Sequence, residues 1–314
     1  MPPTISICIP CYRSEKFIRT TIESVLAQTV PADEIIISDD QSPDRSFEII
    51  EEYRGFPRVK ITRPPERTTL GGHYRFLLEQ ATSDYVCFLS SDDAMHPEFL
   101  ETMHKQLEGE SNVSIIAGAC YETDANLKPL RVRGTGGPKR SLDFPESFAY
   151  FKQGCVYTIS FSLLARRVLL AAPPIPKAGD LATDWCWAML ESASGRVKFQ
   201  NRPLGYYRIH STNAGHNQGE AWEKACVHML TFLQSYLPKE LGDQLKPSLE
   251  NLLAQIERTH GKQRPPAPRP SLKVVVSGWV KSLLTLPHRR LPYPLQQSEA
   301  GISTSLRSAG QERK

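Results

Sequence analysis

The sequence predicts an α/β fold with an open, mostly parallel sheet flanked by helices and followed by a helical C-terminal extension. Short apolar runs alternate with longer segments in which apolar residues recur every three or four positions, the pattern of repeated βα units. Ile35, Ile36 and Ile37 form an unbroken apolar run, as expected for a parallel strand covered by helices on both faces. The predicted strands span residues 5–10, 34–38, 59–62, 85–89 and 113–119.

Helical periodicity follows these strands. Ile18, Ile22 and Val25 lie on one buried stripe of a helix predicted at residues 15–28. Pro97 is expected to open the helix after the strand at 85–89, because proline favours the first helical position. Between residues 121 and 182 the periodicity is weaker. Further helices are predicted at residues 46–53, 72–81, 184–190, 220–237 and 245–257, and short strands at residues 197–199 and 206–208.

The composition, with 40% hydrophobic and 23% charged residues, is typical of a soluble globular protein. The first residues lack the basic and apolar regions of a signal peptide, and no apolar run reaches the roughly 18 residues that span a bilayer. The seven cysteines show no paired metal-site spacing, and the pair Cys8 and Cys11 is interpreted as inert. We therefore expect a cytoplasmic protein with free, mostly buried thiols.

The C-terminal segment differs in charge from the rest of the chain. Residues 262–314 hold ten Lys or Arg and two acidic residues, a net of +8, which leaves 28 basic and 32 acidic residues elsewhere, a net of −4. This distribution indicates an anionic partner for the tail and argues against a protein that binds nucleic acid throughout. Residues 264–270 form a Pro-rich linker, and residues 272–284 carry Trp279 with basic flanks. That segment is expected either to lie peripherally in a membrane interface, or to pack on the domain, or to be disordered.

Two acidic pairs, Asp39-Asp40 and Asp92-Asp93, directly follow two of the predicted strands. Ligands of open parallel sheets bind at the carboxyl ends of the strands, so both pairs should lie at that edge. Clustered carboxylates repel unless a cation lies between them, and hard oxygen ligands suit Mg²⁺ or Mn²⁺, with a diphosphate completing the coordination shell. The alternative is that each pair caps the helix that follows it.

Four successive segments resemble landmarks of the inverting family 2 glycosyltransferases. They are Pro10-Cys11-Tyr12, residues 24–29, residues 34–44 and residues 85–93, in the family's order and spacing. The resemblance covers residues 5–210, roughly two-thirds of the chain. It implies the GT-A fold, a nucleotide-diphosphate-sugar donor and a divalent metal, Mn²⁺ or Mg²⁺.

The resemblance also divides the chain. A GT-A domain is expected at residues 1–215, with a nucleotide-binding half at about 1–120 and an acceptor half at about 121–215. Residues 216–261 would form the helical extension and residues 262–314 the basic tail.

Donor contacts follow from the matching positions. Asp40 resembles the acid that accepts a hydrogen bond from the nucleobase, and Pro10 and Tyr12 resemble residues that line the same pocket. Asp92 matches the last acid of the D-x-D signature and is the expected ligand of metal and diphosphate, with Asp93 as neighbouring support. Ser90 replaces the usual first acid, which puts nucleotide affinity and metal dependence in question.

A second set of donor contacts is implied further along the chain. Arg75, with His73, lies in the helix after Gly71-Gly72, where the family often shows polar contacts to the donor; a solvated helix face is the alternative. Residues 206–210 resemble the family's Y-x-R-x-H-like element, so His210, and with it Arg208, is expected at the metal or diphosphate. Residues 211–219 would form a lid over them.

The catalytic base is expected at Asp184. Thr183-Asp184-Trp185 resembles the family's acidic pair, with Thr183 replacing the usual Glu. An inverting transfer needs one carboxylate to take the proton of the acceptor hydroxyl as its oxygen attacks the anomeric carbon. A helix N-cap is the alternative for Asp184. Trp185 and Trp187 are expected either in the core or stacked on a sugar ring.

The resulting hypothesis is transfer of a sugar, hexosyl or related, from a UDP- or dTDP-sugar to a glycan or glycolipid hydroxyl, in surface polysaccharide or glycolipid synthesis. The alternative is a catalytically weak or inactive relative that binds nucleotide sugars, which Ser90 and Thr183 favour. A dinucleotide oxidoreductase is excluded, since no G-x-G-x-x-G follows the first strand.

Overall fold

The computed structural model describes residues 2–134, 136–155, 157–211 and 219–260. The chain divides into a first unit, Met1–Ile256, and a second, Glu257–Lys314, of which only residues 257–260 are described. The predicted basic tail at 262–314 and most of the predicted lid therefore lie outside the described residues.

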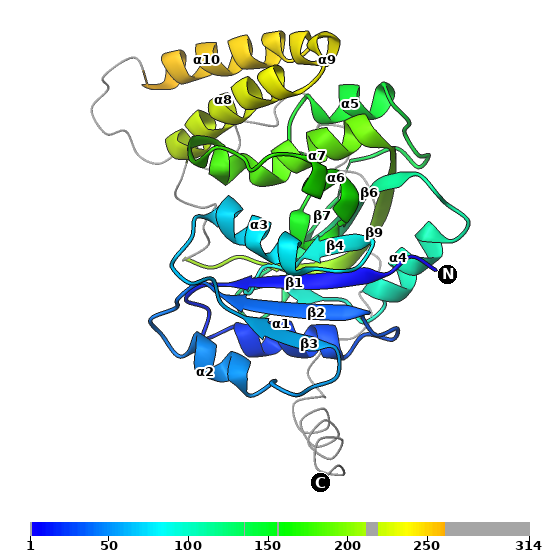
Figure 1. Cartoon of the computed structure of the whole chain (residues 1–314), viewed down its shortest axis with the longest axis vertical. Coiled ribbons are helices and arrows are strands. Elements are labelled where there is room, and N and C mark those ends of the chain that lie inside the picture. The colour runs from blue at the N-terminus through cyan, green and yellow to red at the C-terminus, as the bar shows by residue number, and fades with distance from the viewer. Residues whose placement is uncertain (1, 135, 156, 212–218, 261–314) are drawn as a thin grey trace. The chain divides into compact units, whose positions relative to one another are not determined.

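Four parallel strands form the first half of the sheet, in the order β3-β2-β1-β4 (Figure 1). They are β1 Ile5–Cys11, β2 Glu34–Asp39, β3 Val59–Thr62 and β4 Tyr85–Phe88. Side chains alternate across this layer as the pleat requires: Cys8, Ile36 and Phe88 enter one core cluster, and Ile7 and Ile37 enter the other. The apolar runs are thus buried on both faces, which confirms the predicted α/β class.

The second half of the sheet is mixed. β8, Leu163–Ala165, pairs antiparallel with β4 on one side and with β6, Val113–Thr123, on the other. β6 then pairs in parallel with β9, Arg196–Arg208. The sequence did not indicate three of the strands: β8, β5 at Ala94–Met95, which pairs with β9, and β7 at Pro129–Arg133, which pairs with β6. The two short strands predicted at residues 197–199 and 206–208 are parts of the single strand β9.

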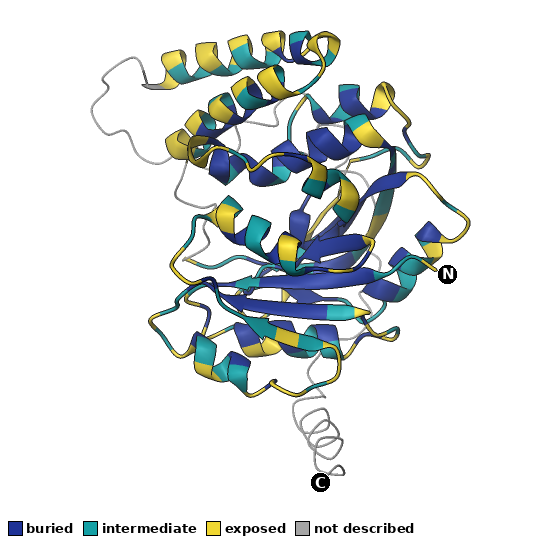
Figure 2. Cartoon of the chain, viewed as in Figure 1, coloured by how far each residue is buried: buried dark blue, intermediate teal, exposed yellow. Residues whose placement is uncertain are grey.

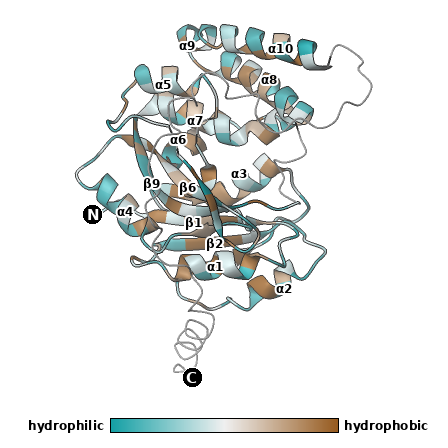
Figure 3. Ribbon diagram, turned by 180° about the vertical axis from the view of Figure 1, so that it is seen from behind, coloured by the Kyte–Doolittle hydropathy of each residue, from teal (hydrophilic) through white to brown (hydrophobic). Residues whose placement is uncertain are grey.

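Helices cover both faces of the sheet. One face carries α1 Ile18–Leu26, α2 Ser46–Glu51 and α4 Phe99–Leu107, whose apolar residues share a cluster with Ile7 and Ile37. On the other face lie α3 Leu70–Gln80, α5 Glu146–Phe151, α6 Arg166–Ala171 and α7 Thr183–Ser194. Figure 2 shows the strands between these layers as buried, and Figure 3 shows hydrophobic residues concentrated on them. Two short 3-10 helices, η1 Ile159–Phe161 and η2 Lys177–Ala182, complete the second layer.

One predicted helix start was wrong. α4 begins at Phe99 and not at Pro97. The reason is a turn between them, in which the backbone N–H of Phe99 donates to the carbonyl of His96 at 2.9 Å and that of Glu98 donates to the His96 ring at 3.2 Å.

The helical extension consists of α8 Gly219–Tyr236, α9 Lys239–Asp243 and α10 Lys246–His260. Cys226, Met229 and Leu233 of α8 are buried in the same core cluster as Trp185 and Trp187 of α7. Both tryptophans are therefore core residues, as one of the two interpretations required. All seven cysteines are free; six are buried and Cys155 is half-buried, which confirms the expected thiols. None of the described helices is long and apolar enough to cross a membrane.

Candidate active site

Asp40 is fixed at the carboxyl end of β2 by contacts from two other segments. Its backbone N–H donates to the carbonyl of Cys11, at the end of β1, at 2.8 Å. Its carboxylate Oδ1 accepts from the backbone N–H of Thr68 at 2.8 Å and from the Thr68 hydroxyl at 3.0 Å. Asp40 is buried at the carboxyl edge of the sheet, just beyond the pairing of Cys11 with Asp39 that joins β1 to β2, where a ligand of the sheet would bind.

Arg67, which sequence reasoning missed, contacts both Tyr12 and Asp40. The guanidinium of Arg67 lies 3.5 Å from the ring centroid of Tyr12, and its Nε is 3.9 Å from Oδ2 of Asp40. Arg67 thus joins two of the predicted donor-binding residues. A cation just beyond the third strand, at the same sheet edge as the acidic pairs, is a signal that could have identified it.

Asp39 points elsewhere. Its side chain is fully buried, and its Oδ2 contacts Nη2 of Arg63 at 2.9 Å and accepts from the backbone N–H of Ser42 at 3.0 Å.

Neither acidic pair caps a helix: α2 begins after Arg45 and α4 after Glu98. The capping alternative is therefore wrong for both pairs.

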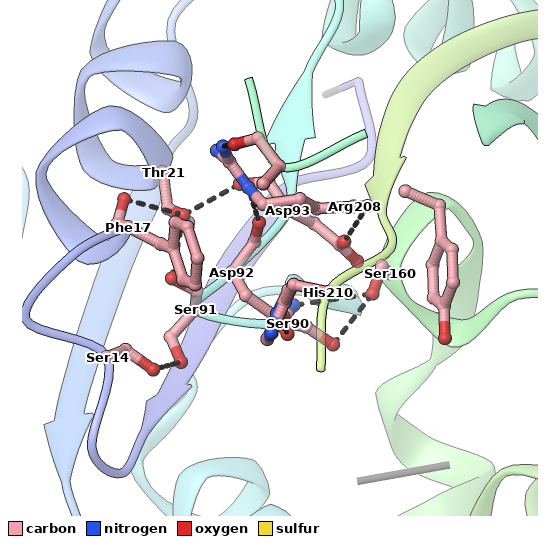
Figure 4. Close-up of polar contacts among 12 residues, drawn as sticks. Ser14, Phe17, Thr21, Ser90, Ser91, Asp92, Asp93, Ser160, Arg208 and His210 are labelled. Atoms are coloured by element: carbon pink, nitrogen blue, oxygen red, sulfur yellow. Dashed lines mark hydrogen bonds and ion pairs between the residues drawn. The ribbon is translucent and has the colours of Figure 1, made fainter. Parts of the chain in front are cut away.

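Asp92 and His210 meet in the structure although 118 residues separate them. Oδ2 of Asp92 and Nε2 of His210 are 2.9 Å apart, and the side chains are 23% and 11% exposed (Figure 4). The His210 ring also packs against Phe17 of the segment before α1, with ring centroids 4.7 Å apart. The two residues predicted as metal ligands therefore form one partly accessible pair.

Asp93 and Arg208 form the support behind this pair (Figure 4). Oδ1 of Asp93 accepts from the backbone N–H of Arg208 at 2.9 Å, and Nε of Arg208 donates to the carbonyl of Asp92 at 2.6 Å. Burial, and next the charge of Asp92, raise the pKa of the Asp93 carboxyl well above its usual range. Strand β9 thereby holds the 90–93 segment in register, and Asp92 alone of its two acids faces outward.

Ser90, the departure from the family pattern, is part of a hydroxyl pair. Its Oγ is 2.9 Å from Oγ of Ser160, and Ser91 is similarly 2.6 Å from Ser14 (Figure 4). Both hydroxyls are hydrogen-bonded within the protein. Because serine is neutral, the site carries less negative charge than a D-x-D segment with two acids.

The donor set at this position fits a divalent cation. Asp92 would offer a carboxylate oxygen, a ligand that Mg²⁺ and Mn²⁺ favour, and His210, 2.9 Å away, would offer an imidazole nitrogen. Within the described residues no group of three or more His, Cys, Asp or Glu side chains could hold a metal. An ion here would therefore depend on diphosphate oxygens and water for its remaining ligands, as Mg²⁺ commonly does.

Asp184, the predicted base, lies in the first turn of α7. The N-cap of that helix is Ala182, so the N-cap alternative is wrong for Asp184. Its Oδ1 accepts from the backbone N–H of Trp185 at 2.7 Å, and Oδ2 accepts from the thiol of Cys155 at 3.4 Å. Burial raises the pKa of the Asp184 carboxyl above its ordinary value of 3.8. A carboxyl with a raised pKa and neutral hydrogen-bond donors is suited to accepting a proton.

Asp180, the other acid considered for this role, is engaged differently. Its Oδ1 accepts from the backbone N–H of Gly71 at 2.6 Å, and the Thr183 hydroxyl donates to its carbonyl at 2.6 Å. The carboxylate thus sits at the N-terminus of α3, where the helix dipole favours a negative charge.

The ring of Tyr74 in α3 packs between β4 and α7: its centroid lies 5.2 Å from that of Phe88 and 5.9 Å from that of Trp187. Burial raises the pKa of this phenol, and the charges of Asp184, Asp92 and Asp93 raise it further. The neighbouring His73 faces the other acidic pair: its Nε2 is 2.8 Å from the Ser38 hydroxyl, and burial lowers its pKa while Asp40 and Asp39 oppose that shift.

Arg75 occupies a different surface of α3. Its Nε contacts Glu79 at 2.7 Å, and its Nη1 donates to the carbonyls of Leu169 and Ala172 at 3.3 and 3.0 Å. It also lines a cavity of about 300 Å³ with Pro174, Ile175 and Lys177. Its guanidinium is thus held toward α6, and donor contact by Arg75 stays a prediction.

The model of glycosyl transferase family 2 matches residues 6–170, more than half of the chain. The chain belongs to this family. Similar family members include an uncharacterized glycosyltransferase of Nostoc sp., 29% identical over 67% of this chain and 66% of its own length. The putative glycosyltransferase EpsH of Bacillus subtilis is 30% identical over 66% of this chain and 61% of its own length. The chain spans somewhat less than two-thirds of these relatives.

Solved structures share the fold. Staphylococcus aureus TarS 1-349 in complex with UDP-GlcNAc superposes with a TM-score of 0.64 at 18% identity, covering 82% of this chain and 74% of that one. The mannosyltransferase PcManGT from Pyrobaculum calidifontis, in complex with GDP-Man and Mn²⁺, gives 0.57 at 13% identity, covering 85% and 77%. The predicted GT-A fold is confirmed.

Proposed function

We propose that this family 2 chain is an inverting glycosyltransferase that moves a hexosyl or related sugar from a nucleotide-diphosphate sugar to a hydroxyl acceptor. The observation that carries the proposal is the meeting of Asp92 with His210 just after β4, the strand against which α7, the helix of Asp184, packs with the rings of Phe88 and Trp187 5.0 Å apart. Donor ligands and a candidate base thereby share one neighbourhood, which a transfer between two bound molecules requires.

The proposed donor is a UDP- or dTDP-sugar. Asp40, Pro10 and Tyr12 would bind the nucleoside, with Arg67 stacked on the aromatic ring. Support comes from the fold shared with TarS, whose structure contains UDP-GlcNAc.

Asp92 and His210 would hold Mn²⁺ or Mg²⁺ against the diphosphate. The ion would neutralise the charge that develops on the leaving diphosphate. Arg208, packed over Phe17 with its guanidinium carbon 4.6 Å from the ring centroid, would keep the backbone of Asp92 in place. Asp184 would take the acceptor proton into a carboxylate that Trp185 and Cys155 orient.

The proposed acceptor is a glycan or glycolipid in the synthesis of a surface polysaccharide. The names of two relatives support this class: a putative teichuronic acid biosynthesis glycosyltransferase of Bacillus subtilis, 27% identical over 71% of this chain, and TarS, a poly(ribitol-phosphate) β-N-acetylglucosaminyltransferase, 24% identical over 82%. We place the enzyme in the cytoplasm, with the basic tail at 262–314 making a peripheral contact with anionic lipid.

A thermal-shift screen against nucleotide sugars, with and without Mn²⁺, tests the proposal. A bound donor raises the melting temperature in proportion to its affinity, and the shift should need the metal. Slow donor hydrolysis in the same samples would mark an active enzyme. Donor binding without hydrolysis or transfer would favour the inactive relative, and no shift with any nucleotide sugar would contradict the proposal.

A further inference from the structure

Strand β7 carries a cation pair that the donor site does not use. Arg131 and Arg133 lie two positions apart and so point to the same side of the strand. Both approach Glu122 of the neighbouring strand β6, whose side chain is only 9% exposed. Arg131 makes the close ion pair, whereas Nη1 of Arg133 is 3.9 Å from the carboxylate. One carboxylate thus faces two guanidinium groups, which leaves a net positive charge on Arg133.

Arg133 extends from there toward the reaction centre. Its guanidinium carbon lies 5.2 Å from the ring centroid of Tyr207 in β9, the strand that ends at Arg208, two residues before His210. Its charge lowers the pKa of Asp184, against the larger effect of burial. It also lowers the pKa of Tyr207, which burial and Asp93 raise to about 12. Arg133 therefore lies over the strand that holds the 90–93 segment, and its charge favours the ionised form of Asp184.

The side chain is available to a ligand. It is 44% exposed, and within the described part of the chain its only ion pair is the 3.9 Å contact with Glu122. A planar guanidinium held over an aromatic ring presents its N–H groups in a fork that matches a carboxylate or a phosphate. By contrast, the base itself is surrounded by the neutral donors of Cys155 and Trp185.

Building on the proposed transferase function, we propose that Arg133 binds an anionic group of the acceptor, a phosphate or a carboxylate, and so selects acceptors that carry a negative charge beside the reacting hydroxyl. Such a contact orients the acceptor toward Asp184 and adds binding energy outside the donor. Arg133 is thereby a specificity residue of the acceptor side.

The test measures binding by calorimetry to the full chain with UDP and Mn²⁺ already bound, so that the diphosphate position is filled. Two matched probe pairs are used: a short poly(glycerol phosphate) against uncharged polyglycerol of equal length, and methyl glucuronide against methyl glucoside. The first pair reports phosphate and the second carboxylate. The proteins are the wild type, Arg133→Gln, Arg133→Lys and the control Arg202→Gln. Arg202 is a similarly exposed arginine of β9, paired with Glu98 at 2.8 Å.

We expect the wild type to prefer one anionic probe over its neutral partner by about tenfold or more, which corresponds to about 1.4 kcal/mol. Arg133→Gln should abolish this preference, Arg133→Lys should restore part of it, and Arg202→Gln should leave it intact. The basic tail is identical in all four proteins, so any difference isolates the charge at position 133.

Three results would overturn the inference: no anion preference in the wild type, a preference that survives Arg133→Gln, or a loss of UDP affinity in Arg133→Gln with the preference unchanged, which would place Arg133 on the donor side. Failure of the wild type to bind UDP or any nucleotide sugar would instead contradict the transferase function itself.

Discussion

The acids at the sheet edge and the acids of α7 differ in the kind of group that contacts them. Each acid at the ends of β2 and β4 has a basic residue among its partners. The partners are Arg63 for Asp39, Arg67 for Asp40, His210 for Asp92 and the backbone of Arg208 for Asp93. In α7, Asp184 is bound by a thiol and a backbone N–H, and Glu191 is fully buried. Burial raises the pKa of both.

This difference indicates two kinds of chemistry in one fold. Alternating acids and bases at the sheet edge can hold a charged ligand such as a metal diphosphate without a large change in local charge. A half-buried carboxyl with a raised pKa is instead suited to gaining and losing a proton. We therefore propose that the first region binds charged groups and that the second transfers a proton.

The largest expected effect is that of Asp184→Asn. The change is nearly isosteric, so the fold and donor affinity should persist, while sugar transfer falls by roughly 10²–10⁴, the usual contribution of a positioned base. Transfer rates at saturating donor, beside a melting curve, measure this. Asp180→Asn is the matched comparison: its main cost should be stability, because Asp180 sits at the start of α3. Undiminished transfer by Asp184→Asn would move the base elsewhere.

Asp92→Asn should be the next most damaging change. Losing one of the two protein ligands should remove several kcal/mol of stabilisation from the leaving group, about 10²–10³ in rate. The Mn²⁺ concentration required for half-maximal activity should rise as well. Titrating Mn²⁺ into both proteins checks this, and an unaltered metal dependence would exclude Asp92 as a ligand.

Asp40→Ala should act mainly on donor binding. Its carboxylate follows β2, which β1 separates from β4 in the sheet. A lost charged hydrogen bond of about 1.5–3 kcal/mol would raise the Michaelis constant for donor roughly 10–100-fold. Turnover should change less. Steady-state kinetics over a wide donor range separate the two constants; a defect confined to turnover would argue against the role.

The pH dependence should report Asp184. Only the ionised carboxylate can accept the proton, and burial raises its pKa above 3.8. The transfer rate should therefore fall about tenfold per pH unit below that raised pKa. Arg133→Gln removes a charge that lowers this pKa, so its acidic limb should move to higher pH. A rate constant unchanged down to pH 4 would contradict the assignment.

The smallest effect is predicted for Glu191→Gln, a change in stability. Neither carboxylate oxygen of Glu191 has a hydrogen-bond partner among the described residues, and burial raises its pKa well above 4.5. The folded state then holds the proton more tightly, so the wild type loses stability as pH rises above 4.5. At neutral pH the variant should melt about 2–4 °C higher for each 1 kcal/mol gained. Equal melting temperatures from pH 5 to 8 would contradict this.

Strand ends were the part of the site that the sequence could predict. An apolar run followed by two acids places Asp40 and Asp92 at one sheet edge, because parallel strands share a direction. The meeting of Asp92 with His210 followed only from the resemblance to a family, since no local pattern links residues 118 positions apart. Arg67 and Arg133 were missed because their significance lies in the rings beneath them, Tyr12 and Tyr207, and not in their own segments.

The strands, too, were predicted only where a local sequence pattern marks them. Strands β1 to β4 were predicted almost residue by residue, because each is a short apolar run with helical periodicity after it. β5 was not predicted, because a strand of two residues is too short to show an alternating pattern. β7 was not predicted either, because its outward residues Leu130 and Val132 are exposed. β9 was divided in two because polar residues at 200–202 interrupt its apolar pattern in the middle.

The proposal that the sheet edge binds the donor and that α7 transfers the proton is tested most directly by comparing two variants in the same two assays. Asp92→Asn and Asp184→Asn are each assayed, on one preparation, for affinity and for transfer with the nucleotide sugar that stabilises the wild type most. We predict that Asp92→Asn weakens metal-dependent donor binding and transfer together, whereas Asp184→Asn binds donor as the wild type does and loses transfer. Equal loss of donor binding in both variants, or retained transfer in Asp184→Asn, would contradict it.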